Sequence, residues 1–187
     1  MKYLLSLFLL LSACASSQIA AEMDYASVVE KNSDSIRRYS GFYNTLDMEA
    51  TILNSEVAAA QLSHGVTTYQ WDDKKQGEEK TSLENRLSKE AEFFLSFFTP
   101  ERKNDDLSRP ATMWKIFLDV DGKRFEGKAK KIKLQLAEIQ AQYPYHNRFY
   151  TPYIVTFPVS MRSIEGKPMK LTLTGPVGSG SLNFPRN

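Results

Sequence analysis

The predicted fold depends most on one stretch of the sequence, residues 113–127, MWKIFLDVDGKRFEG. Apolar side chains recur at every second position of the first half, at Trp114, Ile116, Leu118 and Val120. A period of two is that of a strand with one face in a core. Asp121-Gly122 follows at once and favours a type I′ turn, because both central positions of that turn need positive φ. The stretch therefore predicts an antiparallel hairpin.

Other segments of strand length flank this hairpin. EFFLSFF (92–98) is apolar on both faces, which is typical of a central strand covered on both sides. Alternation over 46–53 predicts a half-buried strand. Four later segments alternate in the same way: IKLQL (132–136), PYIVTFPV (152–159), MKLTLTG (169–175) and SLNF (181–184). About seven strands without βαβ alternation favour a mainly β fold, an antiparallel β-sandwich that is immunoglobulin-like or an open barrel.

Two or three helices near the N-terminus are expected to decorate this sandwich. Residues 24–39 repeat apolar side chains at helical spacing, with an interruption at 33–35 where the helix can break. NSEVAAAQLSHG (54–65) predicts a helix that starts at its first residues and ends near Gly65.

The next segment is strongly charged. WDDKKQGEEK (71–80) is typical of a loop, and Thr81 and Glu84 after it have the spacing of a capping box that would begin a helix. We therefore expect residues 24–90 to be a helical region with one strand, forming one domain with the β-rich segment 91–187.

The first residues have the pattern of a targeting signal. MKYLLSLFLLLSACASS (1–17) places Lys2 before an apolar run that is too short to cross a hydrocarbon core of roughly 30 Å. This is the form of a secretory signal peptide. Leu11-Ser12-Ala13-Cys14 resembles the lipobox of bacterial lipoproteins, and the resemblance covers residues 1–14 only. It implies a signal peptide of residues 1–13 and acylation of Cys14, for example with palmitate. An ordinary signal peptide, cleaved elsewhere, is the alternative.

Cysteine usage favours the lipid. Cys14 is the only cysteine, so an exported chain can form no internal disulfide, and acylation would account for the single thiol. Ala15 stands where related lipoproteins kept in the inner membrane carry aspartate, which by resemblance implies the outer membrane, facing the periplasm. Residues 14–23 would be a spacer between the lipid and the fold. The membrane is thus an expected partner, through the lipid.

Composition limits the remaining classes of function. The 24 basic and 22 acidic side chains nearly balance, which gives no electrostatic case for nucleic-acid binding. The two histidines and one cysteine cannot build the usual zinc centre, so no metal site and no cofactor other than the lipid is predicted.

The segment YPYHNRFYTPY (143–153) is the predicted binding surface. Its flat rings and polar edges are suited to a glycan or a peptide. The residues of this candidate surface are Tyr143, Tyr145, His146, Arg148 and Tyr150. The alternative is a stiff lead into a buried strand, since Pro144 and Pro152 fix φ and Tyr153 has the phase of the core.

A basic cluster follows the 121–122 turn. It consists of Lys123, Arg124, Lys128, Lys130, Lys131 and Lys133. Such a cluster can contact an anionic membrane surface. It can also be the solvated edge of a sheet, where lysines oppose aggregation.

Catalytic motifs are missing from the sequence, which contains no G-x-S-x-G and no phosphate-binding loop. We therefore expect a lipid-anchored envelope protein that is a non-catalytic binding or structural module for a protein partner or an envelope glycan. The alternative is a periplasmic hydrolase of an envelope polymer, if the fold brings carboxylates together. The carboxylates considered for that role are Glu49, Glu92, Glu126 and Glu138.

Overall fold

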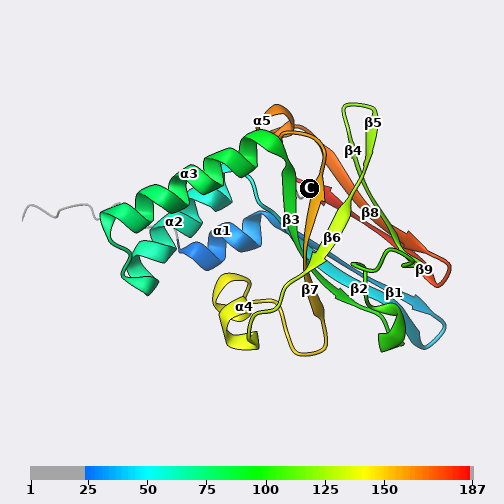
Figure 1. Ribbon diagram of the computed structural model, residues 1–187. Coiled ribbons are helices and arrows are strands. Elements are labelled where there is room, and N and C mark those ends of the chain that lie inside the picture. The colour runs from blue at the N-terminus through cyan, green and yellow to red at the C-terminus, as the bar shows by residue number, and fades with distance from the viewer. Residues whose placement is uncertain (1–23, 186–187) are drawn as a thin grey trace, which may run out of the picture.

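A computed structural model describes residues 24–185, which fold into two antiparallel sheets and a layer of helices (Figure 1). The first sheet has the strand order β1-β2-β3-β7-β6 and the second has the order β5-β4-β8-β9. This confirms a mainly β, sandwich-like fold with helices, and neither sheet of the described chain closes into a barrel.

The nine strands of the described chain divide between the sheets as follows. The five-stranded sheet contains β1 (Ser33–Ser40), β2 (Tyr43–Ile52), β3 (Ala91–Phe98), β6 (Lys128–Lys131) and β7 (Thr151–Phe157). The four-stranded sheet contains β4 (Lys115–Val120), β5 (Lys123–Glu126), β8 (Met169–Gly175) and β9 (Gly178–Phe184). The helices are α1 (Tyr25–Lys31), α2 (Ser55–Tyr69), α3 (Asp73–Lys89), α4 (Leu136–Gln142), α5 (Met161–Ile164) and a 3₁₀ turn, η1 (Arg102–Asn104).

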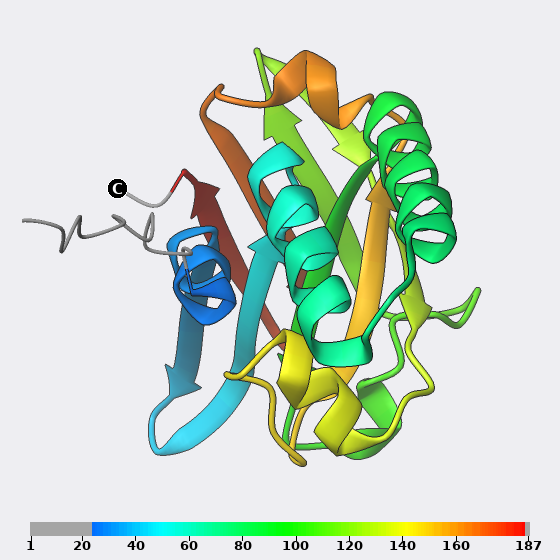
Figure 2. The ribbon, with the colours of Figure 1, turned by 90° about the vertical axis from the view of Figure 1, so that its left-hand side faces the viewer.

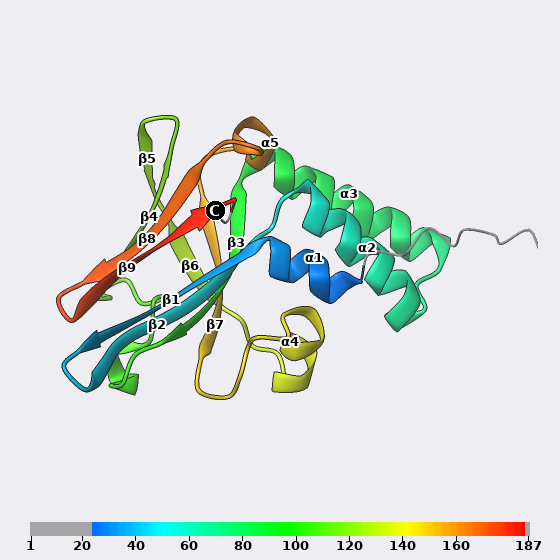
Figure 3. The same cartoon turned by 180° about the vertical axis from the view of Figure 1, so that it is seen from behind.

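The three layers enclose two apolar cores. Helices α1, α2, α3 and α4 lie over one face of the five-stranded sheet (Figure 2), and the four-stranded sheet lies on the opposite side (Figure 3). The larger core fills the space between the sheets and includes Phe93, Leu118 and Leu171. The smaller core lies between the helices and the sheet, where Val57 and Phe94 meet.

Strand β3 is central, as its sequence predicts. It pairs with β2 on one side and β7 on the other. Phe93, Leu95 and Phe97 belong to the core between the sheets, whereas Phe94 belongs to the core under the helices. Two buried faces explain why no polar face is visible in its sequence.

The 113–127 stretch forms the hairpin β4–β5, as predicted. Asp121 and Gly122 have φ of 52° and 70°, the values that a type I′ turn needs. Gly127 then takes the chain from β5 in one sheet to β6 in the other. A Cβ atom at this position would lie 2.5 Å from the ring of Phe157, so a side chain would collide with the core at the crossing.

The prediction for residues 24–39 is only half right. Helix α1 ends at Lys31, and the side-chain amide of Asn32 donates to the carbonyl oxygen of Val28 at 2.9 Å. Residues 33–40 are not helical. They form β1, which pairs along its length with β2. The 24–90 region therefore contains two strands instead of one.

The prediction of a loop over 71–80 is wrong, as is the capping box at Thr81. Asp72 caps α3 by accepting a hydrogen bond from the backbone N–H of Lys75 at 2.7 Å. Thr81 is inside the helix, and its hydroxyl donates to the carbonyl oxygen of Gly77 at 2.9 Å. Helix α2 also continues past Gly65 to Tyr69.

The prediction of a strand over 132–136 is wrong, because no strand covers these residues. β6 ends at Lys131, and α4 begins at Leu136 with a capping box formed by Gln135 and Glu138.

Within residues 24–185, none of the helices has both the length and the apolar character that crossing a bilayer requires.

Candidate functional site

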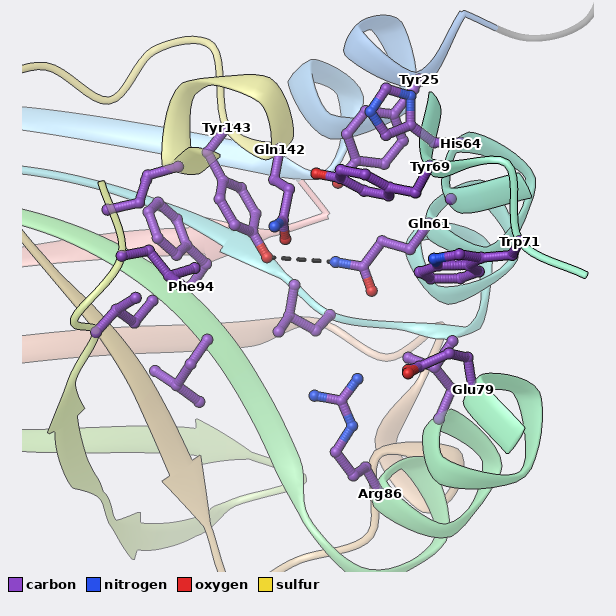
Figure 4. Close-up of a pocket in the computed structure, with 17 residues that line it drawn as sticks. Tyr25, Gln61, His64, Tyr69, Trp71, Glu79, Arg86, Phe94, Gln142 and Tyr143 are labelled. Atoms are coloured by element: carbon purple, nitrogen blue, oxygen red, sulfur yellow. Dashed lines mark hydrogen bonds between the residues drawn. The ribbon is translucent and has the colours of Figure 1, made fainter. Parts of the chain in front are cut away.

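A cavity of about 390 Å³ lies between the helices and the outer face of the five-stranded sheet (Figure 4). That volume is within the range of small-molecule sites. Helical spacing places the side chains of α2 and α3 on its wall. Gln61, His64 and Gly65 share one face of α2, and Glu79, Leu83 and Arg86 share one face of α3.

The part of the cavity against the sheet is apolar. Leu53, Phe94, Ile132, Leu134 and Ile154 line it there, and Leu83 and Ile139 add apolar contact from the helices. Tyr143, which follows α4, stacks flat on Phe94 with ring centroids 3.5 Å apart and planes at 1°. These side chains offer a ligand apolar contact and few hydrogen bonds.

Aromatic rings form the wall on the side of α1 and α2. Tyr25 stacks on His64 with centroids 4.5 Å apart, and Tyr69 lies 6.0 Å from Trp71 in a stacked arrangement. Gly65 makes room for Trp71, since a Cβ atom at that position would lie 2.3 Å from the indole ring. Figure 4 shows this wall opposite Phe94 and Tyr143.

Two tyrosine hydroxyls reach the cavity with few partners. The Gln61 side-chain amide donates to the Tyr143 hydroxyl at 3.3 Å. Burial raises the pKa of the Tyr143 phenol well above its usual range. Tyr25 is only 9% exposed, and its buried hydroxyl makes no hydrogen bond of normal geometry in the described chain. Burial raises the pKa of Tyr25 to about 12, an effect that the nearby Gln61 amide partly opposes.

Two charged side chains complete the lining. Arg86 Nη1 lies 3.2 Å from an oxygen of Glu92 just outside the cavity. Burial of Glu92 raises the pKa of its carboxyl group, and Arg86 opposes that rise. Glu79 pairs with Lys75 at 2.6 Å and is the one carboxylate among the described lining residues.

The predicted surface at 143–150 is largely folded back onto the sheet. Tyr143 and His146 are buried, and Tyr145 and Tyr150 are partly covered. The Tyr145 hydroxyl lies 2.6 Å from the Thr51 hydroxyl, and His146 Nδ1 lies 2.5 Å from the Ser96 hydroxyl. Arg148 is exposed, above the ring of Phe149. Of the five predicted residues, Tyr143 alone is among the described residues that line the cavity.

The basic cluster is divided between two edge strands. Lys123 and Arg124 are on β5, the edge of the four-stranded sheet, where Arg124 pairs with Asp119 at 2.7 Å. Lys128, Lys130 and Lys131 are on β6, the edge of the five-stranded sheet, and Lys133 follows it. Both positions agree with the sheet-edge alternative for this cluster.

The four carboxylates considered for hydrolysis do not meet in the cavity. They lie on β2 (Glu49), β3 (Glu92), β5 (Glu126) and α4 (Glu138). Glu126 pairs with Lys115 at 2.6 Å, and Glu138 accepts a hydrogen bond from the backbone N–H of Gln135 at 2.8 Å. No group of three metal-ligating side chains is present among residues 24–185.

Most of the cavity was not predicted from the sequence, because its walls come from six separate elements. One local signal exists, the pair of large rings at Tyr69 and Trp71 in an otherwise polar segment. A tryptophan in such a segment is expected to pack against another part of the chain. In the structure the Trp71 ring packs closely against Gly65.

Comparisons of the chain with protein-family models, with curated proteins and with solved structures found no match. The lipobox and its Cys14 lie outside the described residues.

Proposed function

We propose that this chain is a lipid-anchored protein of the bacterial envelope that works as a non-catalytic binding module. Its binding site is the cavity between the helices and the five-stranded sheet. The lipobox supports the location, and the cavity supports the binding role.

The observation that carries the proposal is the Tyr25 hydroxyl. A buried polar group without a hydrogen bond costs about 1–3 kcal/mol, and native proteins leave few of them. This hydroxyl belongs to a residue that lines a cavity of ligand size. A bound molecule that accepts a hydrogen bond from Tyr25 would remove this cost.

Binding is favoured over hydrolysis by the acids of the site. A glycoside hydrolase of the usual kind needs two carboxyl groups flanking the scissile bond. Glu79 is the one carboxylate among the described lining residues, and it is already paired with Lys75. His146 makes its side-chain hydrogen bond to Ser96 and is not among the described lining residues.

Native mass spectrometry of the full-length protein, recovered from envelopes of a bacterium that expresses it, tests the proposal. We expect a bound small molecule on the wild-type chain and its loss in Gln61→Trp, because the larger side chain fills the cavity. Gln76→Trp is the matched control, since Gln76 is exposed on α3 and is not among the described lining residues.

The outcomes separate clearly. A molecule retained by Gln76→Trp and lost from Gln61→Trp supports the proposal. A molecule that both variants retain equally contradicts it. So does a wild-type chain that is recovered empty and, when mixed with envelope extract, binds nothing whose binding Gln61→Trp removes.

A further inference from the structure

We infer that the cavity binds an amphiphilic anion: an acyl-type chain against the sheet, with an acidic group at Arg86 and a hydrogen-bond acceptor at Tyr25. This inference deepens the proposed function and rests on it. It names the chemical class of the ligand, which the cavity's position alone leaves open.

The apolar part of the ligand follows from the side chains against the sheet. Leu53, Phe94 and Ile154 present only hydrocarbon there, and Leu83 and Ile139 approach from the helices. A sugar in this position would bury hydroxyl groups without partners, which is unfavourable. An acyl chain gains binding free energy from each CH₂ group that it buries.

The polar part of the ligand follows from the hydrogen-bond donors of the lining. Tyr25 has an unpartnered hydroxyl, and the Tyr143 hydroxyl already accepts from Gln61, so its own proton is available to a ligand. Trp71 adds an indole N–H, which can only donate. The one lining carboxylate, Glu79, is already paired with Lys75. These donors suit the acceptor oxygens of a carboxylate, a phosphate or a carbonyl group of a ligand.

Arg86 is the cation that fits the acidic group. Its side chain is 44% exposed, and its Nη1 lies 3.2 Å from Glu92 in their ion pair. A guanidinium group has five N–H donors and suits the two oxygens of a carboxylate or a phosphate. An incoming acid can thus bind Arg86 without first displacing Glu92.

The neighbouring edge strand adds positive potential on the same side. Lys130 of β6 is paired with Ile154 of β7, which lines the cavity. Residues opposite each other in an antiparallel pair point to the same face of a sheet. Lys130 therefore lies on the face that carries the cavity, and so does Lys128, two residues before it. These lysines would attract an anion to the site.

Binding of a matched pair of probes tests the ligand class. The full-length Cys14→Ser chain is titrated with N-decanoylglycine and with its methyl ester. Quenching of Trp71 fluorescence reports binding, and Trp71→Phe identifies this signal, because Trp114 belongs to the other core. We expect the acid to bind about tenfold more tightly than the ester, the size of one charge-assisted hydrogen bond.

Variants assign the contacts. Arg86→Gln should remove the preference for the acid and leave the ester unaffected. Glu92→Gln should strengthen binding of the acid, because a like charge beside the bound acid is removed. This second variant tests Arg86 even if Arg86→Gln folds poorly. Tyr25→Phe should weaken both probes several-fold without lowering the stability of the ligand-free chain, since the lost hydroxyl has no hydrogen bond there. Tyr145→Phe is the control, because it removes a satisfied hydroxyl and should destabilise the fold.

Decyl phosphate distinguishes a carboxylate ligand from a phosphate ligand. If decyl phosphate binds more tightly than N-decanoylglycine, the acidic group of the natural ligand is a phosphate. Equal affinity for acid and ester would overturn the inference, as would tight binding of N-acetylglucosamine with no binding of either acyl probe. The proposed function survives either result if native mass spectrometry finds a bound molecule that Gln61→Trp removes. An acid that binds equally well to Gln61→Trp would overturn the assignment of the cavity.

Discussion

His146 shows how burial changes the meaning of a residue that looks accessible in the sequence. Its ring packs edge-on against Phe94, with centroids 5.9 Å apart, and its Nδ1 meets the Ser96 hydroxyl. The backbone oxygen of His146 accepts a hydrogen bond from the Gln140 side chain at 2.9 Å. Burial lowers the pKa of His146, because the charged imidazolium loses hydration. The neutral ring is therefore part of the folded structure.

This lowered pKa predicts a pH dependence of stability. The unfolded chain has a histidine pKa of about 6.5, above that of the folded chain, so below this pH the unfolded state binds more protons. The free energy of unfolding should fall as the pH drops through and below about 6.5. Urea unfolding over this range should show a shallower dependence for His146→Gln than for wild type. Equal slopes for the two chains would show that His146 does not contribute.

At the scale of elements, the connection from α2 to α3 forms one wall of the cavity. Helix α2 runs four residues beyond Gly65, where the sequence predicts its end, to Tyr69. Trp71 then folds back on Gly65, and Asp72 caps α3 at once. The first half of α3 has no apolar side chain between residues 73 and 82, so no helical periodicity could appear there. Its helical state follows from the cap and from Leu83 and Leu87, which are buried.

Two glycines in these helices should respond oppositely to alanine. Gly77 has nothing within 4 Å of an added Cβ atom, so Gly77→Ala should raise the free energy of unfolding by about 1 kcal/mol through helix propensity. At Gly65 the added methyl group would overlap the Trp71 ring. Gly65→Ala should move the indole outward, shift its emission to longer wavelength and weaken ligand binding. Unchanged emission in Gly65→Ala, with the same gain in stability as Gly77→Ala, would contradict the packing described for Trp71.

At the scale of the molecule, the helical layer begins shortly after the predicted anchor in the sequence. Asp24 directly precedes α1, whose first residue, Tyr25, lines the cavity. Nine residues, 15–23, lie between Cys14 and Asp24, and a chain of that length spans at most about 35 Å. An acylated Cys14 would therefore hold the cavity within reach of the bilayer, where amphiphilic anions are found.

The anchor has its own prediction. Cys14→Ser should abolish metabolic labelling of the protein with a radioactive fatty acid and release it from the membrane fraction, because the only thiol is lost. Ser12→Ala is a suitable control, since a small residue is kept before the cysteine and labelling should persist. Labelling that survives in Cys14→Ser would show that the lipobox resemblance is misleading.

The sequence by itself determined the strands β2, β3, β4, β5, β7, β8 and β9 and the antiparallel class of the fold. Alternation of apolar residues and the Asp121-Gly122 turn are local properties, so they can be recognised without knowing the contacts. Tyr143 was singled out in the same way, although for an exposed surface. What only the tertiary structure decided is the strand at 33–40, the burial of His146 and the cavity. The strand at 33–40 depends on its pairing with the next strand, β2. The burial of His146 and the cavity depend on packing between segments far apart in the chain, as with Tyr25 and His64. Contacts of that kind leave no periodic pattern in either partner.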